Sequence, residues 1–116
     1  MRLRDVAKQL LIDPRKFTEY ALNPNSPIGK DKSVMFRQYL GFTQENYQPL
    51  LEQIQAQAMD AEASLGISDE HGQRYQVDLE IRGMEAGQQE IVRTGWIVRS
   101  NEDIARLVTL YVRRRK

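Results

Sequence analysis

The sequence predicts an α+β fold in which N-terminal helices pack on a small C-terminal antiparallel β-sheet, a meander. Apolar residues recur at helical spacing up to about residue 63, whereas beyond Gly66 they alternate with polar residues in the pattern of half-buried strands. Since the chain has 116 residues and 41% of them are apolar, we expect a single domain spanning 1–116. Its expected parts are a helical part at 1–63, an antiparallel sheet at 73–112 and a basic tail at 113–116.

The first twelve residues have two interpretations. Leu3, Val6, Leu10 and Leu11 fit the spacing of a helix, and "QLLI" also suits an extended segment. Of the two, we favour the helix.

A short helix is expected in "DPRKFTEYAL". Asp13 is a typical N-cap residue, and Pro14 suits the first helical position. Prolines 24 and 27 then prevent a helix, so the segment "NPNSPIG" should form a loop that carries Lys30 and Lys32.

Two longer helices follow in the predicted order. "KSVMFRQYLG" has a broad apolar stripe and ends at Gly41, a typical C-terminal capping residue. The next helix is expected from about Asn46 to Ala63, with Pro49 in its first turn, where proline is tolerated.

Three strands are predicted at 73–82, 90–99 and 106–112, consecutive and antiparallel. In the second strand, Thr94 and Trp96 share one face, and Arg93 and Gly95 share the other. We expect Trp96 to be buried against residues of the helices such as Phe36 and Ile54.

The composition excludes several classes of chemistry. There is no cysteine and His71 is the single histidine, so disulfides, thiolate catalysis and the usual zinc sites are excluded. We expect no metal and no cofactor, because the Walker loop, the dinucleotide glycines and the nucleophile elbow are all absent. His71 is interpreted as a solvated turn residue or, alternatively, as a general base from a loop.

No segment of the sequence indicates a membrane protein. "MRLRDVAKQLL" is interrupted by charges too often for a signal peptide or a membrane span. We therefore expect a cytoplasmic protein.

The charge is unevenly distributed, although the net charge is only +1. Residues 1–37 sum to +4, residues 38–90 to −8 and residues 91–116 to +5. If the two basic ends meet in the fold, they form a face that attracts phosphate; the alternative is a solvated surface of mixed charge.

Hydroxyl and cationic side chains are concentrated in the last two strands. They are Thr94, Thr109, Tyr111, Arg93 and Arg106, with Lys30 and Lys32 from the loop. Such groups suit cleavage of a phosphodiester, which needs a proton acceptor, a proton donor and cations for the phosphorane. The alternative is structural, since Thr and Tyr are common in strands, and Arg74 then belongs to a solvated strand face.

A family resemblance adds to this interpretation. The order of "FTEYALNPNSPIGKDKSVMF", "GQRYQVDLEI", "RTGWIV" and "EDIARLVTLY" resembles an uncharacterised bacterial domain-of-unknown-function family. Its members occur as small stand-alone proteins and at the C-termini of polymorphic toxins. The resemblance implies a fold similar to the metal-independent ribonucleases of the barnase, EndoU, colicin and RelE group.

The resemblance also implies site residues and partners. The catalytic candidates become Lys30, Lys32, Thr94, Arg106, Thr109 and Tyr111, and the substrate-binding candidates Arg74 and Arg93. The expected partners are RNA and a small immunity or antitoxin-like protein. Ser26 stands where relatives often have histidine, and serine cannot shuttle protons near neutral pH.

Two functions are carried forward. One is a metal-independent ribonuclease of toxin type, and the other is a non-catalytic protein-interaction or RNA-binding module with the same fold. The pattern contains no indication of the oligomeric state.

Overall fold

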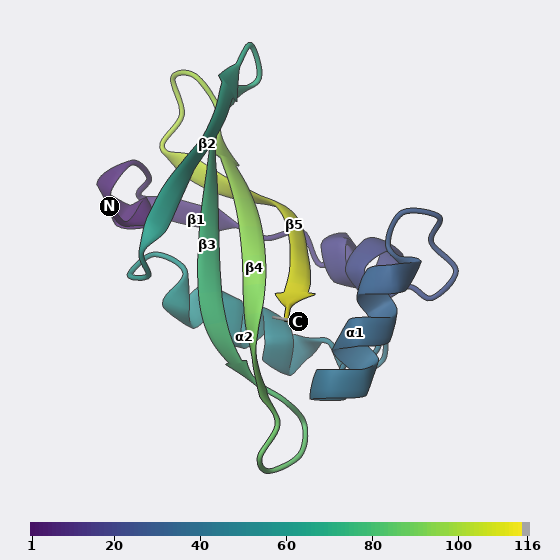
Figure 1. Ribbon diagram of the computed structural model, residues 1–116. Helices are drawn as coiled ribbons and strands as arrows, with labels where there is room; N and C mark the ends of the chain where they lie inside the picture. The colour runs from purple at the N-terminus through teal and green to yellow at the C-terminus, as the bar shows by residue number, and fades with distance from the viewer. Residues whose placement is uncertain (115–116) are drawn as a thin grey trace.

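The computed structural model describes residues 1–114 (Figure 1). The elements in chain order are the 3-10 turn η1 (Leu3–Asp5), strand β1 (Gln9–Leu11), the π-helix η2 (Lys16–Ala21), helices α1 (Lys30–Leu40) and α2 (Gln48–Gln57), and strands β2 (Ala63–Asp69), β3 (Gly72–Arg82), β4 (Gln89–Val98) and β5 (Ile104–Arg113). Within this part of the chain, every helix is too short or too polar to cross a lipid bilayer.

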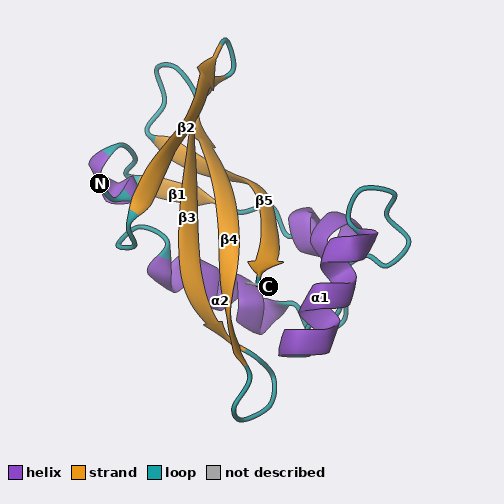
Figure 2. Ribbon diagram, viewed as in Figure 1, coloured by secondary structure: helices purple, strands orange, loops and turns teal. Residues whose placement is uncertain are grey.

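The strands form one five-stranded mixed sheet in the order β1-β5-β4-β3-β2. β1 runs parallel to β5, whereas the other neighbouring pairs are antiparallel. The predicted fold class, N-terminal helices on a C-terminal antiparallel meander, is therefore wrong. The sheet includes a strand that precedes every helix longer than one turn, so the helices are inserted between two parts of the sheet (Figure 2).

The N-terminal segment differs most from the prediction. Instead of a helix, η1 is followed by β1, whose residues Gln9, Leu10 and Leu11 pair with Ile104, Ala105 and Arg106. The Lys8 backbone N–H donates to the Asp103 carbonyl at 2.7 Å. These partners lie almost a hundred residues away, so local spacing could not reveal that the segment is extended.

The helices deviate from their expected bounds for local reasons. η2 is a π-helix, in which the Leu22 N–H donates to the Phe17 carbonyl. α1 begins at Lys30, so both lysines lie in its first turn and not in the preceding loop. It ends, as predicted, at Gly41, which has a φ of 73°.

α2 is shorter than expected because its C-terminal residues belong to a turn and to β2. The helix ends at Gln57, and Ala63 already pairs with Val77 of β3. β2 was not predicted. Ser64, Gly66 and Ser68 are typical of turns, and the apolar residues between them, Leu65 and Ile67, remain exposed.

β3, β4 and β5 lie close to the three predicted ranges and pair in consecutive antiparallel order. β4 and β5 shift register between Gly95 and Trp96. One face of these strands carries the core, which also includes Phe36 of α1 and Ile54 of α2. Trp96 is 1% exposed in this core, as expected.

The N-terminal segment, residues 1–11, contacts both edges of the sheet. Arg2 forms an antiparallel bridge with Glu62, and the Ala63 N–H donates to the Met1 carbonyl at 2.6 Å, both at the start of β2. A few residues later the same segment forms β1 on the β5 side. The sheet is thus curled, and the N-terminal segment lies behind β2 and β3 (Figure 1).

Candidate functional site

The sheet face turned away from the core carries most of the predicted site residues. We call it the polar face. Strand register sets its side chains in three cross-strand rows: Asp78, Arg93 and Tyr111; Gln76, Gly95 and Thr109; and Arg74, Ile97 and Arg106. These rows follow from the alternation of side chains along each strand.

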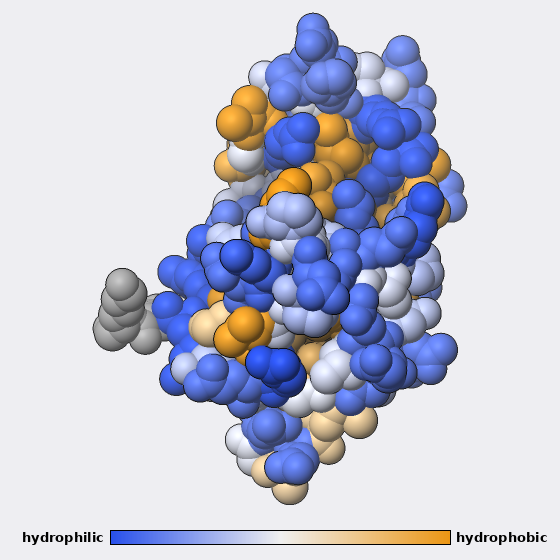
Figure 3. Space-filling view, turned by 90° about the vertical axis from the view of Figure 1, so that its right-hand side faces the viewer, coloured by the Kyte–Doolittle hydropathy of each residue, from blue (hydrophilic) through white to orange (hydrophobic). Residues whose placement is uncertain are grey.

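Gly95 is the only member of these rows without a side chain, and a hollow of about 230 Å³ lies over it. The hollow is lined by residues of β2, β3, β4 and β5, among them Ile67, Arg74, Gln76, Arg93, Thr109 and Tyr111. Viewed from the side of α1, hydrophobic residues lie among hydrophilic ones in the upper half of the molecule (Figure 3).

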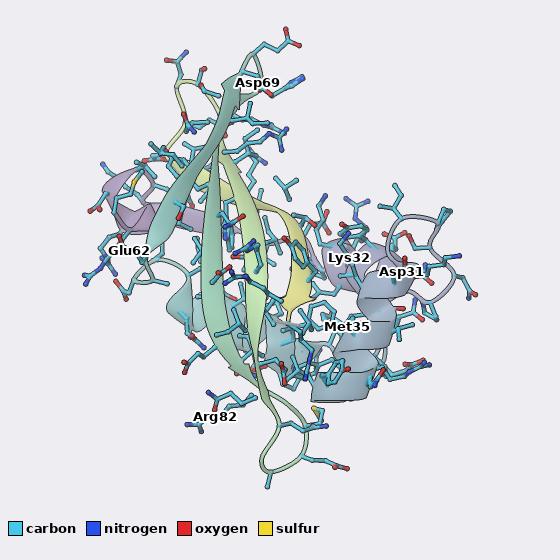
Figure 4. All side chains as sticks on the ribbon, viewed as in Figure 1. Asp31, Lys32, Met35, Glu62, Asp69 and Arg82 are labelled. Carbon is cyan, nitrogen blue, oxygen red and sulfur yellow. The ribbon has the colours of Figure 1, made fainter. Side chains whose placement is uncertain are left out.

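Two residues of the helical part complete the site at its β5 side. The Tyr20 hydroxyl is 2.8 Å from Thr109 Oγ1, which links η2 to β5. Lys32 Nζ lies 5.2 Å from the centre of the Tyr20 ring and 5.8 Å from that of Tyr111. Lys32 extends from α1 on the side that faces β5 (Figure 4).

The surroundings of Tyr20 make its hydroxyl more acidic than that of a free tyrosine, because they lower its pKa. Burial raises the pKa of the Tyr20 hydroxyl, but Lys32 and the hydrogen bond with Thr109 lower it, and the net shift of the pKa is downward. The ammonium group of Lys32 is therefore close enough to stabilise negative charge on the phenol oxygen.

The position of Tyr20 relative to α1 depends on Gly29. A Cβ atom at Gly29 would lie 1.9 Å from the Tyr20 carbonyl oxygen, so only glycine allows this approach. Ser26 supports the same loop, because its Oγ accepts a hydrogen bond from the Gly29 N–H at 3.0 Å. Ser26 is thus buried and structural in this chain.

Arg93 is held at the other side of Tyr111. Its guanidinium donates to both carboxylate oxygens of Asp78, at 2.9 and 3.2 Å. The hydrogen bonds with Asp78 raise the pKa of Arg93, burial lowers it, and the Tyr111 hydroxyl raises it further; the net shift is upward. Arg113 also donates to Asp78, so one carboxylate orients two cations.

The structure brings together five of the predicted residues: Lys32, Thr109 and Tyr111 at one side of the hollow, with Arg93 and Arg74 along its lining. Arg106 lies on the polar face too, where Glu102 binds it at 3.3 Å, but it does not line the hollow.

Lys30 lies away from this group, and Thr94 borders the hollow but has its hydroxyl on the opposite face of the sheet. Lys30 is exposed at the first position of α1. Thr94 is buried on the core face, where its hydroxyl donates to the Val77 carbonyl and accepts from the Trp96 indole N–H, both at 2.7 Å. Both of its hydrogen bonds are thus made inside the protein.

Sequence reasoning missed Tyr20, Gln76, Asp78 and Gly95 as parts of the site. Tyr20 lies in the expected short helix "DPRKFTEYAL", and its contact with Thr109 spans 89 positions. Gly95 carried a usable signal, since an isolated glycine within a strand often marks a bulge or a close approach.

His71 is exposed, and its nearest carboxylate is Glu70 at 3.6 Å.

Residues 1–114 contain no group of three or more His, Cys, Asp or Glu side chains arranged to hold a metal ion.

A family model described as a domain of unknown function, DUF6883, matches residues 2–114. No curated protein and no solved structure matches the chain.

Proposed function

We propose that this chain, which belongs to the DUF6883 family, is a metal-independent ribonuclease of toxin type. The observation that carries the proposal is the group formed by Lys32, Tyr20, Thr109 and Tyr111 beside the hollow. A cation lies between two phenols, one of which is hydrogen bonded to a threonine hydroxyl. We expect the protein to act on RNA in the cytoplasm, with a small immunity-like protein as its partner.

The proposed reaction assigns one role to each group. The Tyr20 phenolate accepts the proton of the ribose 2′-hydroxyl, and the 2′-oxygen attacks the adjacent phosphorus. The bond from phosphorus to the 5′-oxygen breaks, and the Tyr111 hydroxyl donates the proton that this oxygen needs. Lys32 and Arg93 stabilise the charge of the phosphorane. The products are a 2′,3′-cyclic phosphate and a 5′-hydroxyl.

The test uses purified protein and an end-labelled single-stranded RNA, with and without EDTA. We expect the same cleavage in both conditions, the two product ends named above, and no cleavage of an all-2′-deoxy oligonucleotide. Lys32→Ala and Tyr20→Phe should each lower kcat/KM at least tenfold, about 1.4 kcal/mol of transition-state stabilisation. Lys8→Ala is the control, because Lys8 is exposed and lies outside this group of residues.

The pH profile provides a second readout. Because activity requires the phenolate, the rate should rise with pH through a pKa below the usual value of about 10 for tyrosine. Removing the ammonium group in Lys32→Ala removes a cause of the lowered pKa, so the rising limb should move to higher pH.

Two outcomes would contradict the proposal. Intact RNA that nevertheless binds with a steep salt dependence would support the non-catalytic RNA-binding module instead. Absence of both binding and cleavage would show that the polar face has no RNA substrate.

A further inference from the structure

We infer that the hollow over Gly95 is a subsite for one unpaired nucleobase, which makes single-stranded RNA the substrate class. The inference rests on the proposed function, because Lys32 and Tyr111 place the phosphate at the β5 side. It concerns the part of the hollow lined by Ile67, Arg74 and Gln76, on β2 and β3, to which the proposed reaction assigns no role.

The shape of the hollow fits a flat group. Its floor is backbone, because Gly95 has no side chain between its cross-strand neighbours Gln76 and Thr109. Its volume of about 230 Å³ is below the range of about 300–1,000 Å³ typical of pockets for drug-sized ligands. The hollow therefore suits one ring system and not a whole nucleotide.

The lining combines apolar surface with a planar cation. Ile67 is 70% exposed although it is a large aliphatic residue, and it borders the hollow together with Val108. Arg74 lies beside them, and its nearest carboxylate, that of Asp69, is 4.0 Å away. This guanidinium is held less tightly than that of Arg93, so it can lie against a base. Proteins stack unpaired bases on aromatic rings and on arginine guanidinium planes, and Arg74 offers a surface of the second kind.

Gln76 supplies a group that can distinguish bases. Its side chain lines the hollow, and among residues 1–114 its amide forms no hydrogen bond with another side chain or with the backbone. A glutamine amide offers both a donor and an acceptor, the combination that recognises the edge of a base.

Strand order sets the two subsites at a suitable separation. Thr109 on β5 and Gln76 on β3 are separated by β4, which is two strand spacings or about 10 Å. One ligand lying across the strands can contact Lys32 and Tyr111 with one end and Gln76 with the other.

The experiment measures binding without cleavage. The probes are an all-2′-deoxy trinucleotide and the same trinucleotide with an abasic central position, both titrated by fluorescence anisotropy. Stacking of a base on an aromatic ring contributes about 1–3 kcal/mol, and we expect the surface of Ile67, Val108 and Arg74 to reach the lower end of this range. The abasic probe should therefore bind at least about fivefold more weakly. Gly95→Val, which fills the hollow, should abolish this difference.

Three further variants make the result specific. Gln76→Leu should change the order of affinity among the four central bases, whereas Gln55→Leu, at an exposed position of α2, should leave it unchanged. A Cβ atom at Gly95 would approach Thr109 Cγ2 to 2.9 Å, so Gly95→Val is first checked for folding by circular dichroism. If it is unfolded, Ile67→Ala replaces it and should reduce the difference between the two probes.

Equal affinity for the intact and abasic probes would overturn the inference. So would a folded Gly95→Val variant, or in its absence an Ile67→Ala variant, that still distinguishes them fully. Base-dependent binding without RNA cleavage would support the subsite and refute the proposed chemistry. RNA cleavage with equal binding of both probes would support the chemistry and refute the subsite.

Discussion

At the scale of single residues, Lys30 and Lys32 illustrate how two neighbouring cations acquire different surroundings. Both lie in the first turn of α1. Because residues i and i+2 of a helix do not share a face, only one of them can point at β5. Lys32 lies over the rings of Tyr20 and Tyr111, whereas Lys30 is exposed.

Trp96 and Thr94 form a buried polar pair inside the core. The indole N–H donates to Thr94 Oγ1, so the largest apolar residue of the core also has its polar atom paired. This pairing explains why a threonine is tolerated at a fully buried position of β4.

We predict that Trp96→Ala lowers the free energy of unfolding by about 3–5 kcal/mol, because it removes a fully buried aromatic side chain. Urea denaturation measures the loss. Trp96→Phe is the comparison variant and should lose less, since it retains most of the apolar area. A loss below about 1 kcal/mol for Trp96→Ala would mean that the indole is accessible to solvent.

At the scale of elements, the site depends on the contact between η2 and the turn before α1. Gly29 lies against the Tyr20 carbonyl, and the Tyr20 side chain contacts both Lys32 and Thr109. The prolines and the glycine of this loop therefore position one tyrosine and one lysine beside a strand that is far away in the sequence.

We predict that Gly29→Ala destabilises the protein by about 1–3 kcal/mol, since the added methyl group would overlap a backbone oxygen. Tyr20 must then move away from Thr109, so the proposed ribonuclease activity should fall more than stability alone explains. Thermal unfolding and kcat/KM are measured together. Unchanged values of both would show that the loop adapts to the methyl group without moving Tyr20.

At the scale of the whole molecule, the first eleven residues hold the curled sheet together. They bridge to the start of β2, form β1 beside β5 and contribute Leu3 and Ala7 to the core. The acidic middle of the chain also binds the basic C-terminal end, because Asp78 forms an ion pair with Arg113 and Glu90 forms one with Arg114. Part of the expected basic tail is thus neutralised; residues 115–116 of that tail lie outside the described residues.

We predict that deletion of residues 2–11 abolishes cooperative unfolding. Loss of the buried Leu3 side chain alone should cost about 2–5 kcal/mol, and the deletion also removes the pairing with β5, against a typical total stability of about 5–15 kcal/mol. Leu3→Ala should remain folded with that smaller loss. A sharp unfolding transition in the deleted protein would show that the remaining strands are sufficient.

The sequence by itself determined the elements whose pattern is local. The alternation in "RYQVDLEIR" and "EIVRTGWIVR" predicted two strands and the core position of Trp96, and Gly41 predicted the end of α1. The alternation also separated Arg93 from Thr94 onto opposite faces, although it could not show that the Thr94 hydroxyl bonds to Trp96 and Val77.

Only the tertiary structure decided the sheet's order and the composition of the site. β1 and β2 depend on partners elsewhere in the chain, because a short or exposed strand is stabilised mainly by pairing and its own side chains carry little pattern. Tyr20 joins the site through a hydrogen bond across 89 positions, and the hollow arises from the absence of a side chain at Gly95. Both features depend on which strands become neighbours, and that choice is made by the packing of the whole chain.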